Sequence, residues 1–358
     1  KVRLMGFLPG VTTPGGMTHQ SIEDISVMRS IPNMTILETG DATEVESICE
    51  AADSIDGPVW CRVLRGSVPR LFDTPIKVGE RLYVATNLGQ AAALDPATGD
   101  LEWYYQFVPG ETHDLDEVFE SVLIDHDGRR SLFKMGKLGI LWELDRTTGA
   151  FVAAHDLGYQ TVLDVDPRTG QVTYRPGMIP QAGVELEFCP DFLGIRNWYA
   201  SAYHPQTQAL YIPIHPTCVK GMFTEIEKEL HAPYYTNSGW LSQGTTAHPD
   251  SPNHRGHLVA MDINSGEILW RHSMTTRPRS AALTTGGGLV LGADTDRHLY
   301  FHDAATGDIL FQTRLPGSVQ GFPMTYAVGG RQYVAVPVGG NRSNAVYVFA
   351  LPEQPVRR

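Results

Sequence analysis

Five short turns of one type recur along the chain, and they constrain its fold more than any other feature. Each turn has an Asp, two variable residues, a Thr or Ser and a Gly, and in four of the five an aromatic residue stands four positions after the Gly. The Asp carboxylate can accept backbone N–H groups of the turn, and Gly can adopt the positive φ that closes a hairpin. The turns begin at Asp95, Asp145, Asp166, Asp262 and Asp303.

The spacing of these turns favours a β-propeller. Asp95 and Asp145 are 50 residues apart and Asp262 and Asp303 are 41 apart, lengths that suit a four-stranded blade. After Pro75, helical patterns disappear and short β runs alternate with Gly and Asp turns. We therefore expect a mainly β fold made of propeller blades. A β-sandwich with ordinary Asp-Gly turns is the alternative.

The first 75 residues have a different pattern. Runs typical of strands alternate with segments that have helical spacing and acidic residues in the first turn. This order, β-α-β-α-β, predicts a small parallel α/β sheet. The predicted strands are Val2–Phe7, Met34–Leu37 and Val59–Leu64, and the predicted helices are Ser21–Arg29 and Asp41–Ser54.

Charge and hydropathy exclude several classes of partner. The 358 residues include 28 basic and 40 acidic side chains, and the net charge of −12 would repel a nucleic-acid backbone. No apolar run approaches the ~20 residues of a membrane span, so we expect no transmembrane segment. Residues 1–10 lack the pattern of a signal peptide and the first residue is not Met, so the N-terminus does not indicate a compartment.

Several ordered motifs resemble the quinoprotein alcohol dehydrogenases, propeller enzymes that use pyrroloquinoline quinone (PQQ) and a metal ion. The resemblance covers about residues 76–350. It implies a partial propeller of about five to six blades over 76–358, because the family propeller usually has eight and the N-terminal blades have no counterpart here. The motifs are WYYQFVPGETHDLDEV (103–118), GKLGILWELDR (136–146), GIRNW (194–198) and GFPMTY (321–326).

The resemblance also implies site residues. Asp114 matches the catalytic base, which takes the proton of a primary alcohol while hydride passes to the quinone, and it matches a metal ligand as well. Asp116 resembles the extra carboxylate of lanthanide-dependent members, with a solvated turn as the alternative. Lys137 matches the cation beside the quinone oxygens, with a surface lysine as the alternative. Asn197 matches a cofactor-contacting amide, with an ordinary turn Asn as the alternative.

The same resemblance implies a PQQ cofactor with Ca²⁺ or a lanthanide ion and a periplasmic location, while a cytoplasmic location remains the alternative. It further implies a disulfide between Cys189 and Cys218. The sequence has no Cys-x-x-Cys-His haem motif, so a cytochrome c acceptor would be a separate protein. Cys49 and Cys61 are predicted to be small core residues of the α/β part.

Three histidines near one another, His248, His254 and His257, could suggest a zinc site. They lack a cysteine or carboxylate at the usual ligand spacing, and Pro and Gly residues surround them. We expect them to be loop residues.

The first 75 residues resemble the pyrimidine-binding domain of transketolases. The likeness rests on TPGGMTHQ (13–20), IPNMT (31–35) and DATE (41–44). It implies that His19 contacts a sugar phosphate, with a capping or solvent-facing histidine as the alternative. The family's glutamate that activates thiamine has no counterpart here, so we do not expect thiamine diphosphate catalysis.

Three functions follow from these patterns. The first is a quinoprotein alcohol dehydrogenase, impaired by the missing blades. The second is a noncatalytic propeller with a binding or structural role, and the third is a transketolase-related fragment in a chimeric reading frame. Open propeller edges and apolar blade faces also predict self-association.

Overall fold

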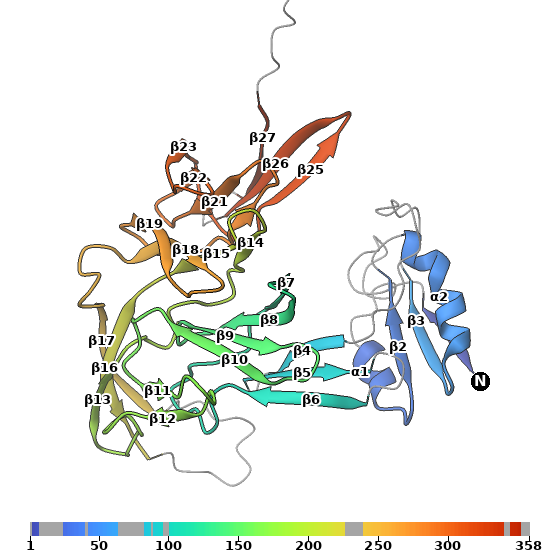
Figure 1. Cartoon of the computed structure of the whole chain (residues 1–358), viewed down its shortest axis with the longest axis horizontal. Coiled ribbons are helices and arrows are strands. Elements are labelled where there is room, and N and C mark those ends of the chain that lie inside the picture. Colours follow the sequence, from blue (N-terminus) through green and yellow to red (C-terminus); the bar gives the residue numbers. More distant parts are fainter. Residues whose placement is uncertain are drawn as a thin grey trace, which may run out of the picture. The chain divides into compact units, whose positions relative to one another are not determined.

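A computed structural model describes residues 2–6, 24–39, 42–63, 82–86, 89–95, 100–225, 239–339 and 344–351. It divides the chain into two compact units. The first comprises Lys1–Leu82 and Leu94–Leu101, and the second Tyr83–Ala93 and Glu102–Arg358. Figure 1 shows the helices and strands of both, from blue at the N-terminus to red at the C-terminus.

The first unit contains a three-stranded parallel sheet. Strands β1 (Arg3–Gly6) and β2 (Thr35–Glu38) both pair in parallel with β3 (Val59–Arg62), which lies between them. Helices α1 (Asp24–Arg29) and α2 (Ala42–Ser54) provide the two crossovers. The predicted β-α-β-α-β order is therefore confirmed.

One apolar cluster forms the core of this unit. Ile48 and Ala52 of α2 pack with Val59 and Cys61 of β3. Cys61 is fully buried, as predicted, but the prediction is wrong for Cys49, whose residue is exposed. The buried stripe of α2 runs through residues four positions apart, and Cys49 lies to the side of that stripe.

The remaining strands lie in separate sheets, and five of these follow one another along the chain. The first has three strands and the others four. They are β4 (Leu82–Thr86), β5 (Gln90–Leu94) and β6 (Leu101–Gln106); β7 (Ser121–His126), β8 (Arg129–Met135), β9 (Ile140–Asp145) and β10 (Phe151–Asp156); β14 (Ala202–His204), β15 (Ala209–Ile214), β18 (Gly256–Asp262) and β19 (Ile268–Met274); β20 (Leu283–Thr284), β21 (Leu289–Ala293), β22 (His298–Asp303) and β23 (Ile309–Arg314); and β24 (Ser318–Val319), β25 (Met324–Val328), β26 (Arg331–Gly339) and β27 (Ala345–Phe349).

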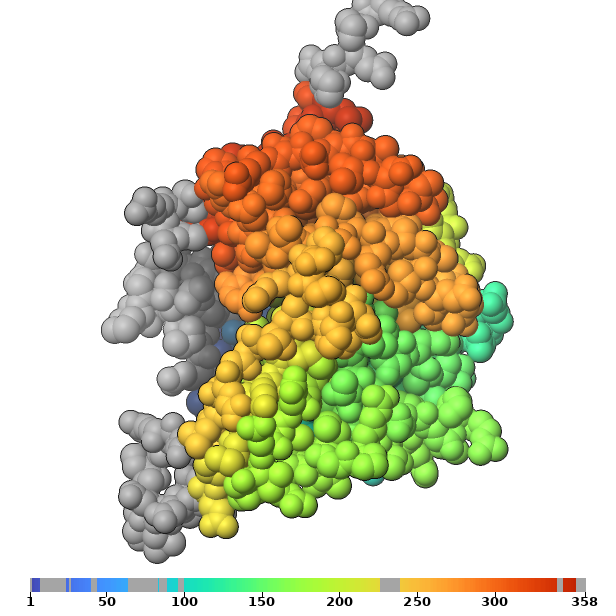
Figure 2. All heavy atoms as spheres, turned by 90° about the vertical axis from the view of Figure 1, so that its left-hand side faces the viewer, coloured from blue at the N-terminus to red at the C-terminus, as the bar shows by residue number. Residues whose placement is uncertain are grey.

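Two smaller sheets interrupt this series between β10 and β18. One is a hairpin, and the other has the strand order β13–β16–β17. Figure 2 draws the residues of β16 and β17 in yellow, beside the green part of the chain. The elements are β11 (Leu163–Val165) and β12 (Val172–Tyr174), then β13 (Glu185–Phe188), β16 (Thr217–Phe223) and β17 (Trp240–Ala247).

Apolar clusters join successive sheets face to face. Phe133 of β8 packs in one cluster with Ile212 of β15 and Val259 of β18. Leu291 of β21 packs with Val336 of β26 in another. Sheets stacked through their faces in chain order are propeller blades, so the structure confirms the predicted mainly β, partial propeller fold, with five such sheets in the described part of the chain.

The recurrent turns have the predicted hydrogen bonds and backbone conformation. Asp145 Oδ1 accepts the N–H groups of Thr147 at 2.8 Å and Thr148 at 3.0 Å, and Gly149 has φ of 75°. The turns at Asp166, Asp262 and Asp303 repeat both features. Residues 96–99 of the first turn lie outside the described residues.

Tryptophans from one sheet dock on the turn of the next. Trp103 donates its indole N–H to the Arg146 carbonyl at 3.1 Å, and a Cβ on Gly149 would lie 2.6 Å from its ring. Trp270 donates equivalently to the Ala304 carbonyl at 2.9 Å, and a Cβ on Gly307 would lie 2.6 Å from that ring. The turn glycine thus provides both the backbone conformation and the space for the indole.

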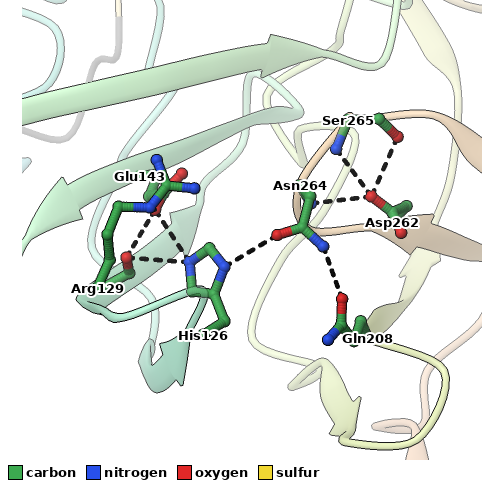
Figure 3. A network of polar contacts seen from close by, with 8 residues as sticks. His126, Arg129, Glu143, Gln208, Asp262, Asn264 and Ser265 are labelled. Carbon is green, nitrogen blue, oxygen red and sulfur yellow. Dashed lines mark hydrogen bonds and ion pairs between the residues drawn. The ribbon is translucent and has the colours of Figure 1, made fainter.

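A polar network links two blades that are distant in the sequence, as Figure 3 shows. His126, at the end of β7, contacts Asn264 Oδ1 through Nδ1 at 2.9 Å and Glu143 Oε1 through Nε2 at 3.1 Å. Ser131 donates to the same Glu143 oxygen at 2.6 Å, and Asn264 donates to Gln208 Oε1 at 2.9 Å. This network joins the β7–β10 sheet to the turn between β18 and β19.

The outer face of the last sheet is apolar and exposed. Its side chains are on the face opposite Val336, and they include Met324 and Val328 of β25 and Val346 and Val348 of β27. Such a face is typical of an interaction surface. The self-association expected from open blade faces remains a prediction.

Candidate functional site

Three of the four predicted site residues lie together. Asp114 and Asp116 belong to the segment between β6 and β7, and Lys137 to the turn between β8 and β9. Lys137 Nζ lies 2.7 Å from Asp116 Oδ2 and 3.3 Å from Asp114 Oδ2, and it donates to the Asp114 carbonyl at 2.6 Å. Two carboxylates therefore converge on one ammonium group.

Lys137 is held by backbone contacts on both sides. Its N–H donates to the Asp116 carbonyl at 3.0 Å, and its carbonyl accepts the Ile195 N–H at 2.7 Å. A Cβ on Gly194 would lie 2.4 Å from Lys137 Cβ, so this close approach needs a glycine. The Lys137 side chain is only 8% exposed, which contradicts the alternative of a surface lysine.

Asp114 combines an unusual backbone with an accessible carboxylate. Its φ is 62°, a region that few residues other than glycine adopt, and its side chain is 65% exposed. Partial desolvation raises the pKa of Asp114, the Lys137 ammonium opposes this, and the carboxylates of Asp116 and Glu111 add to it. Exposure to water keeps the rise in the pKa of Asp114 modest. A raised pKa nevertheless makes the carboxylate a better proton acceptor.

The fourth predicted residue, Asn197, uses its amide locally. Its Nδ2 donates to the Leu193 carbonyl at 2.8 Å, and its Oδ1 accepts the Trp198 N–H at 2.9 Å. This is the arrangement of an ordinary turn Asn, the alternative interpretation of this residue. These two bonds use one Nδ2 hydrogen and one lone pair of Oδ1, so the amide keeps one donor and one acceptor position.

Two buried charged groups that sequence reasoning missed lie beside the site. Glu117 and Lys134 are each 1% exposed. Burial raises the pKa of Glu117 to about 8 and lowers the pKa of Lys134 to about 8. Neither Glu117 oxygen has a partner at hydrogen-bond geometry among the described residues, although the Gly136 and Leu138 amides favour its charged form.

Arg196 and Glu120 form a second buried pair. Arg196 is 1% exposed, donates to the Met135 carbonyl at 2.6 Å and forms an ion pair with Glu120. Burial alone would raise the pKa of Glu120, but Arg196 and the Ser201 hydrogen bonds hold it below its ordinary value. The sequence signal for these groups was Lys134, a single charge inside an otherwise apolar stretch of β8.

The structure tests the cysteine and histidine predictions separately. Cys189 and Cys218 form the predicted disulfide. The prediction of loop histidines is wrong for His257, which lies in β18, is 2% exposed and contacts Ser251 Oγ at 2.9 Å and Ser273 Oγ at 3.1 Å. His248 is also buried.

Each of these two histidines has neighbours that sequence spacing does not show. Tyr159 packs edge-on against His248, with ring centroids 5.2 Å apart, and stacks against His257 at 6.3 Å. His19, the predicted sugar-phosphate contact, lies outside the described residues.

The donor set of the site suits the cofactors that the sequence resemblance implies. Asp114 and Asp116 present anionic oxygens beside the Lys137 ammonium, and such oxygens are the preferred ligands of hard cations. An ammonium next to them suits the oxygens of a quinone. The donor types of these three residues therefore fit a metal ion and a quinone.

Comparison with known proteins identifies the family. Residues 155–334, half of the chain, match the model of the PQQ glucose/ethanol/alcohol dehydrogenase β-propeller domain. The chain belongs to this family. Its turns, its docked tryptophans and its stacked four-stranded sheets are thus those of a PQQ-type propeller.

The relatives in sequence include quinoprotein alcohol dehydrogenases. The chain is 29% identical to the quinoprotein alcohol dehydrogenase PedH of Pseudomonas putida over 318 residues, which cover 80% of this chain and 51% of PedH. It is 31% identical to the dehydrogenase subunit of a quinone-dependent alcohol dehydrogenase of Acetobacter aceti, covering 73% of this chain and 36% of that subunit.

Solved structures give the same result. A europium-containing methanol dehydrogenase matches with a TM-score of 0.62 and 25% identity, over 70% of this chain and 44% of that one. The quinohemoprotein alcohol dehydrogenase of Comamonas testosteroni matches with a TM-score of 0.62 and 25% identity, over 75% and 44%. The chain spans about half the length of the relatives it matches, or less.

Within the described ranges, no helix has the length and apolar character needed to cross a membrane.

Proposed function

We propose that this PQQ-family chain carries the catalytic carboxylate of an alcohol dehydrogenase that oxidises a primary alcohol to an aldehyde. The observation that supports this is the convergence of Asp114 and Asp116 on the ammonium group of the largely buried Lys137. A carboxylate with a raised pKa, accessible to solvent and fixed beside a cation, is suited to take a proton from a bound hydroxyl.

Each residue has a distinct role in this proposal. Asp114 receives the hydroxyl proton on its carboxylate, while its backbone carbonyl stays bonded to Lys137 Nζ. Asp116 and Asp114 would hold a hard cation, Ca²⁺ or a lanthanide, and Lys137 would face the quinone oxygens. When bound, PQQ would supply the acceptor for the hydride of the alcohol carbon, and the cation would polarise the quinone.

The disulfide supports an oxidising compartment for this function, and we propose the periplasm. We propose a cytochrome c as the acceptor of the electrons.

Titration of the purified chain with PQQ and either Ca²⁺ or La³⁺ tests the proposal. The readouts are the absorbance of bound quinone and dye-linked oxidation of a short primary alcohol. Stoichiometric binding with turnover is the expected result. Binding without turnover would favour the noncatalytic propeller, and absence of binding by a folded β protein would overturn the cofactor assignment.

A further inference from the structure

One buried guanidinium group bridges the two chain segments that carry Asp114 and Lys137. Arg196 lies between β13 and β14 and is 1% exposed. Its Nη1 donates to the Met135 carbonyl at 2.6 Å, and its Nη2 forms an ion pair with Glu120 Oε2. Met135 ends β8, two residues before Lys137. Glu120 ends the segment that carries Asp114 and leads directly into β7, so this one side chain contacts both segments of the site.

The carboxylate and the guanidinium group of this pair are fixed by further contacts. Glu120 Oε1 accepts the backbone N–H and the hydroxyl group of Ser201, both at 2.9 Å. The ring of Phe119 lies against the guanidinium group, with Arg196 Cζ 5.6 Å from the ring centroid. A planar fork that donates to a carboxylate and a carbonyl while lying on an aromatic face has a defined orientation. Arg196 is therefore a rigid link between the segments.

The backbone next to Arg196 holds the same turn independently. The Ile195 N–H donates to the Lys137 carbonyl at 2.7 Å, and the Ile195 carbonyl accepts the His215 N–H at 2.8 Å. These bonds do not involve the Arg196 side chain. A substitution of Arg196 should therefore leave the turn attached to residue 195 and remove only the link to Glu120.

We propose that Arg196 is a positioning residue, which sets the separation between the Asp114 carboxylate and the Lys137 ammonium. This inference rests on the proposed function, since it assigns Arg196 a part in the same reaction. A base is effective only within hydrogen-bond reach of the proton that it takes. A displacement of about 1 Å in such a group can lower the rate about 100-fold.

Arg196→Lys separates charge from geometry. It keeps a positive charge opposite Glu120, but a single ammonium nitrogen on a flexible chain does not reproduce the planar fork. Arg175→Lys is the matched control. Arg175 also joins a carboxylate to a carbonyl, Asp164 Oδ1 at 2.9 Å and the Gln160 carbonyl at 3.2 Å, but it lies beside the β11–β12 hairpin.

Steady-state oxidation of a primary alcohol, with PQQ and Ca²⁺ or La³⁺, measures the effect on the reaction. In Arg196→Lys, kcat should fall about 10- to 100-fold while KM for the alcohol changes less than about threefold, because a misplaced base weakens the transition state and not the binding of the alcohol. Arg175→Lys should keep both constants. Far-UV circular dichroism checks that each variant is folded.

Acetylation of Lys137 gives a second readout, which needs neither cofactor nor turnover. The Lys137 side chain is 8% exposed and lies beside two carboxylates, so an N-hydroxysuccinimide ester should acetylate it slowly in the wild type. In Arg196→Lys this rate, followed by peptide mass spectrometry, should rise about tenfold, because the turn opens more often. Lys220, which is 41% exposed, is the internal reference and should react equally in both proteins.

The two readouts separate failure of this inference from failure of the proposed function. A wild type that oxidises no alcohol contradicts the proposed function, and acetylation alone then decides whether Arg196 fixes Lys137. If the wild type turns over, an equal kcat in Arg196→Lys or a loss confined to KM overturns the inference, and so does equal acetylation of Lys137. If Arg196→Lys does not fold, Glu120→Gln replaces it in both measurements under the same criteria, since it keeps an acceptor for Ser201 and removes the charge facing Arg196.

Discussion

The polar clusters around His126 and around Lys137 each place a basic side chain beside carboxylate groups, but they differ in how far their groups are paired. In the first, the oxygens and nitrogens of His126, Ser131 and Glu143 bond to one another, and the network is almost closed to solvent. In the second, Lys137 holds two carboxylates that face solvent. Behind them, Glu117 is buried, and among the described residues neither of its oxygens has a partner at hydrogen-bond geometry.

This difference indicates what each cluster does. A fully paired buried network gives specificity to the packing of two sheets and leaves no group free for a ligand. A cluster with accessible anionic oxygens and unpaired buried groups is less favourable for folding and is typical of a functional site. The following variants would separate these two roles.

The largest expected effect is on activity at the Lys137 cluster. Asp114→Asn should lower dye-linked alcohol oxidation by about 10²- to 10⁴-fold, because the amide cannot take the hydroxyl proton. Its urea unfolding should stay close to wild type, since the side chain is 65% exposed. Asp164→Asn, at an exposed Asp on β11, is the matched control. An unchanged rate for Asp114→Asn would disprove its assignment as the base.

A substitution in the His126 cluster should instead lower the free energy of unfolding. Glu143→Ala leaves His126 Nε2 and the Ser131 hydroxyl without their shared acceptor, and we expect a loss of about 2–3 kcal/mol in the free energy of unfolding in urea. The control is Glu185→Ala, whose exposed ion pair with Lys220 should contribute under about 1 kcal/mol. Equal losses in the two variants would remove the distinction drawn between the clusters.

Acid should destabilise the histidines that have no carboxylate beside them. Burial lowers the pKa of His257 to about 4, and the positive charges of Arg271, His254 and His272 add to this. Between pH 6.5 and 4 the unfolded chain therefore binds a proton that the folded chain does not. The free energy of unfolding should fall with decreasing pH by up to about 1.4 kcal/mol per unit for this group.

His257→Gln tests this assignment. In the variant, the free energy of unfolding in urea should change less steeply with pH between 6.5 and 4. The difference in slope should correspond to about one bound proton. A slope equal to that of the wild type would show that His257 is not responsible for the loss.

The smallest effect is expected at a docked indole, where the lost interaction is a single hydrogen bond. Trp270→Phe keeps an aromatic ring against Gly307 but removes the N–H that bonds to the Ala304 carbonyl. We expect a loss of about 1 kcal/mol, read as a lower Tm. Trp198→Phe, at a residue that is 64% exposed, is the control and should leave the Tm unchanged.

Much of the candidate site could be predicted from the motif around Asp114, and the structure places Asp116 and Lys137 with it. The buried partners could not be predicted in the same way. Glu117 and Asp116 are adjacent acidic residues in the sequence, yet one is 1% exposed and the other has an accessible carboxylate. Only the packing of β8 and of the segment before β7 decides which side chain loses its water.

The sequence by itself determined the elements whose bonds are local. The turn at Asp145 is specified within four residues, because its carboxylate and the following Gly satisfy the same short loop. The tertiary structure decided the contacts that join distant segments, such as His126 with Asn264, 138 residues away, and Tyr159 with His248. Such contacts depend on which strands become neighbours, and that depends on the burial of whole sheet faces, a property that no short stretch of sequence contains.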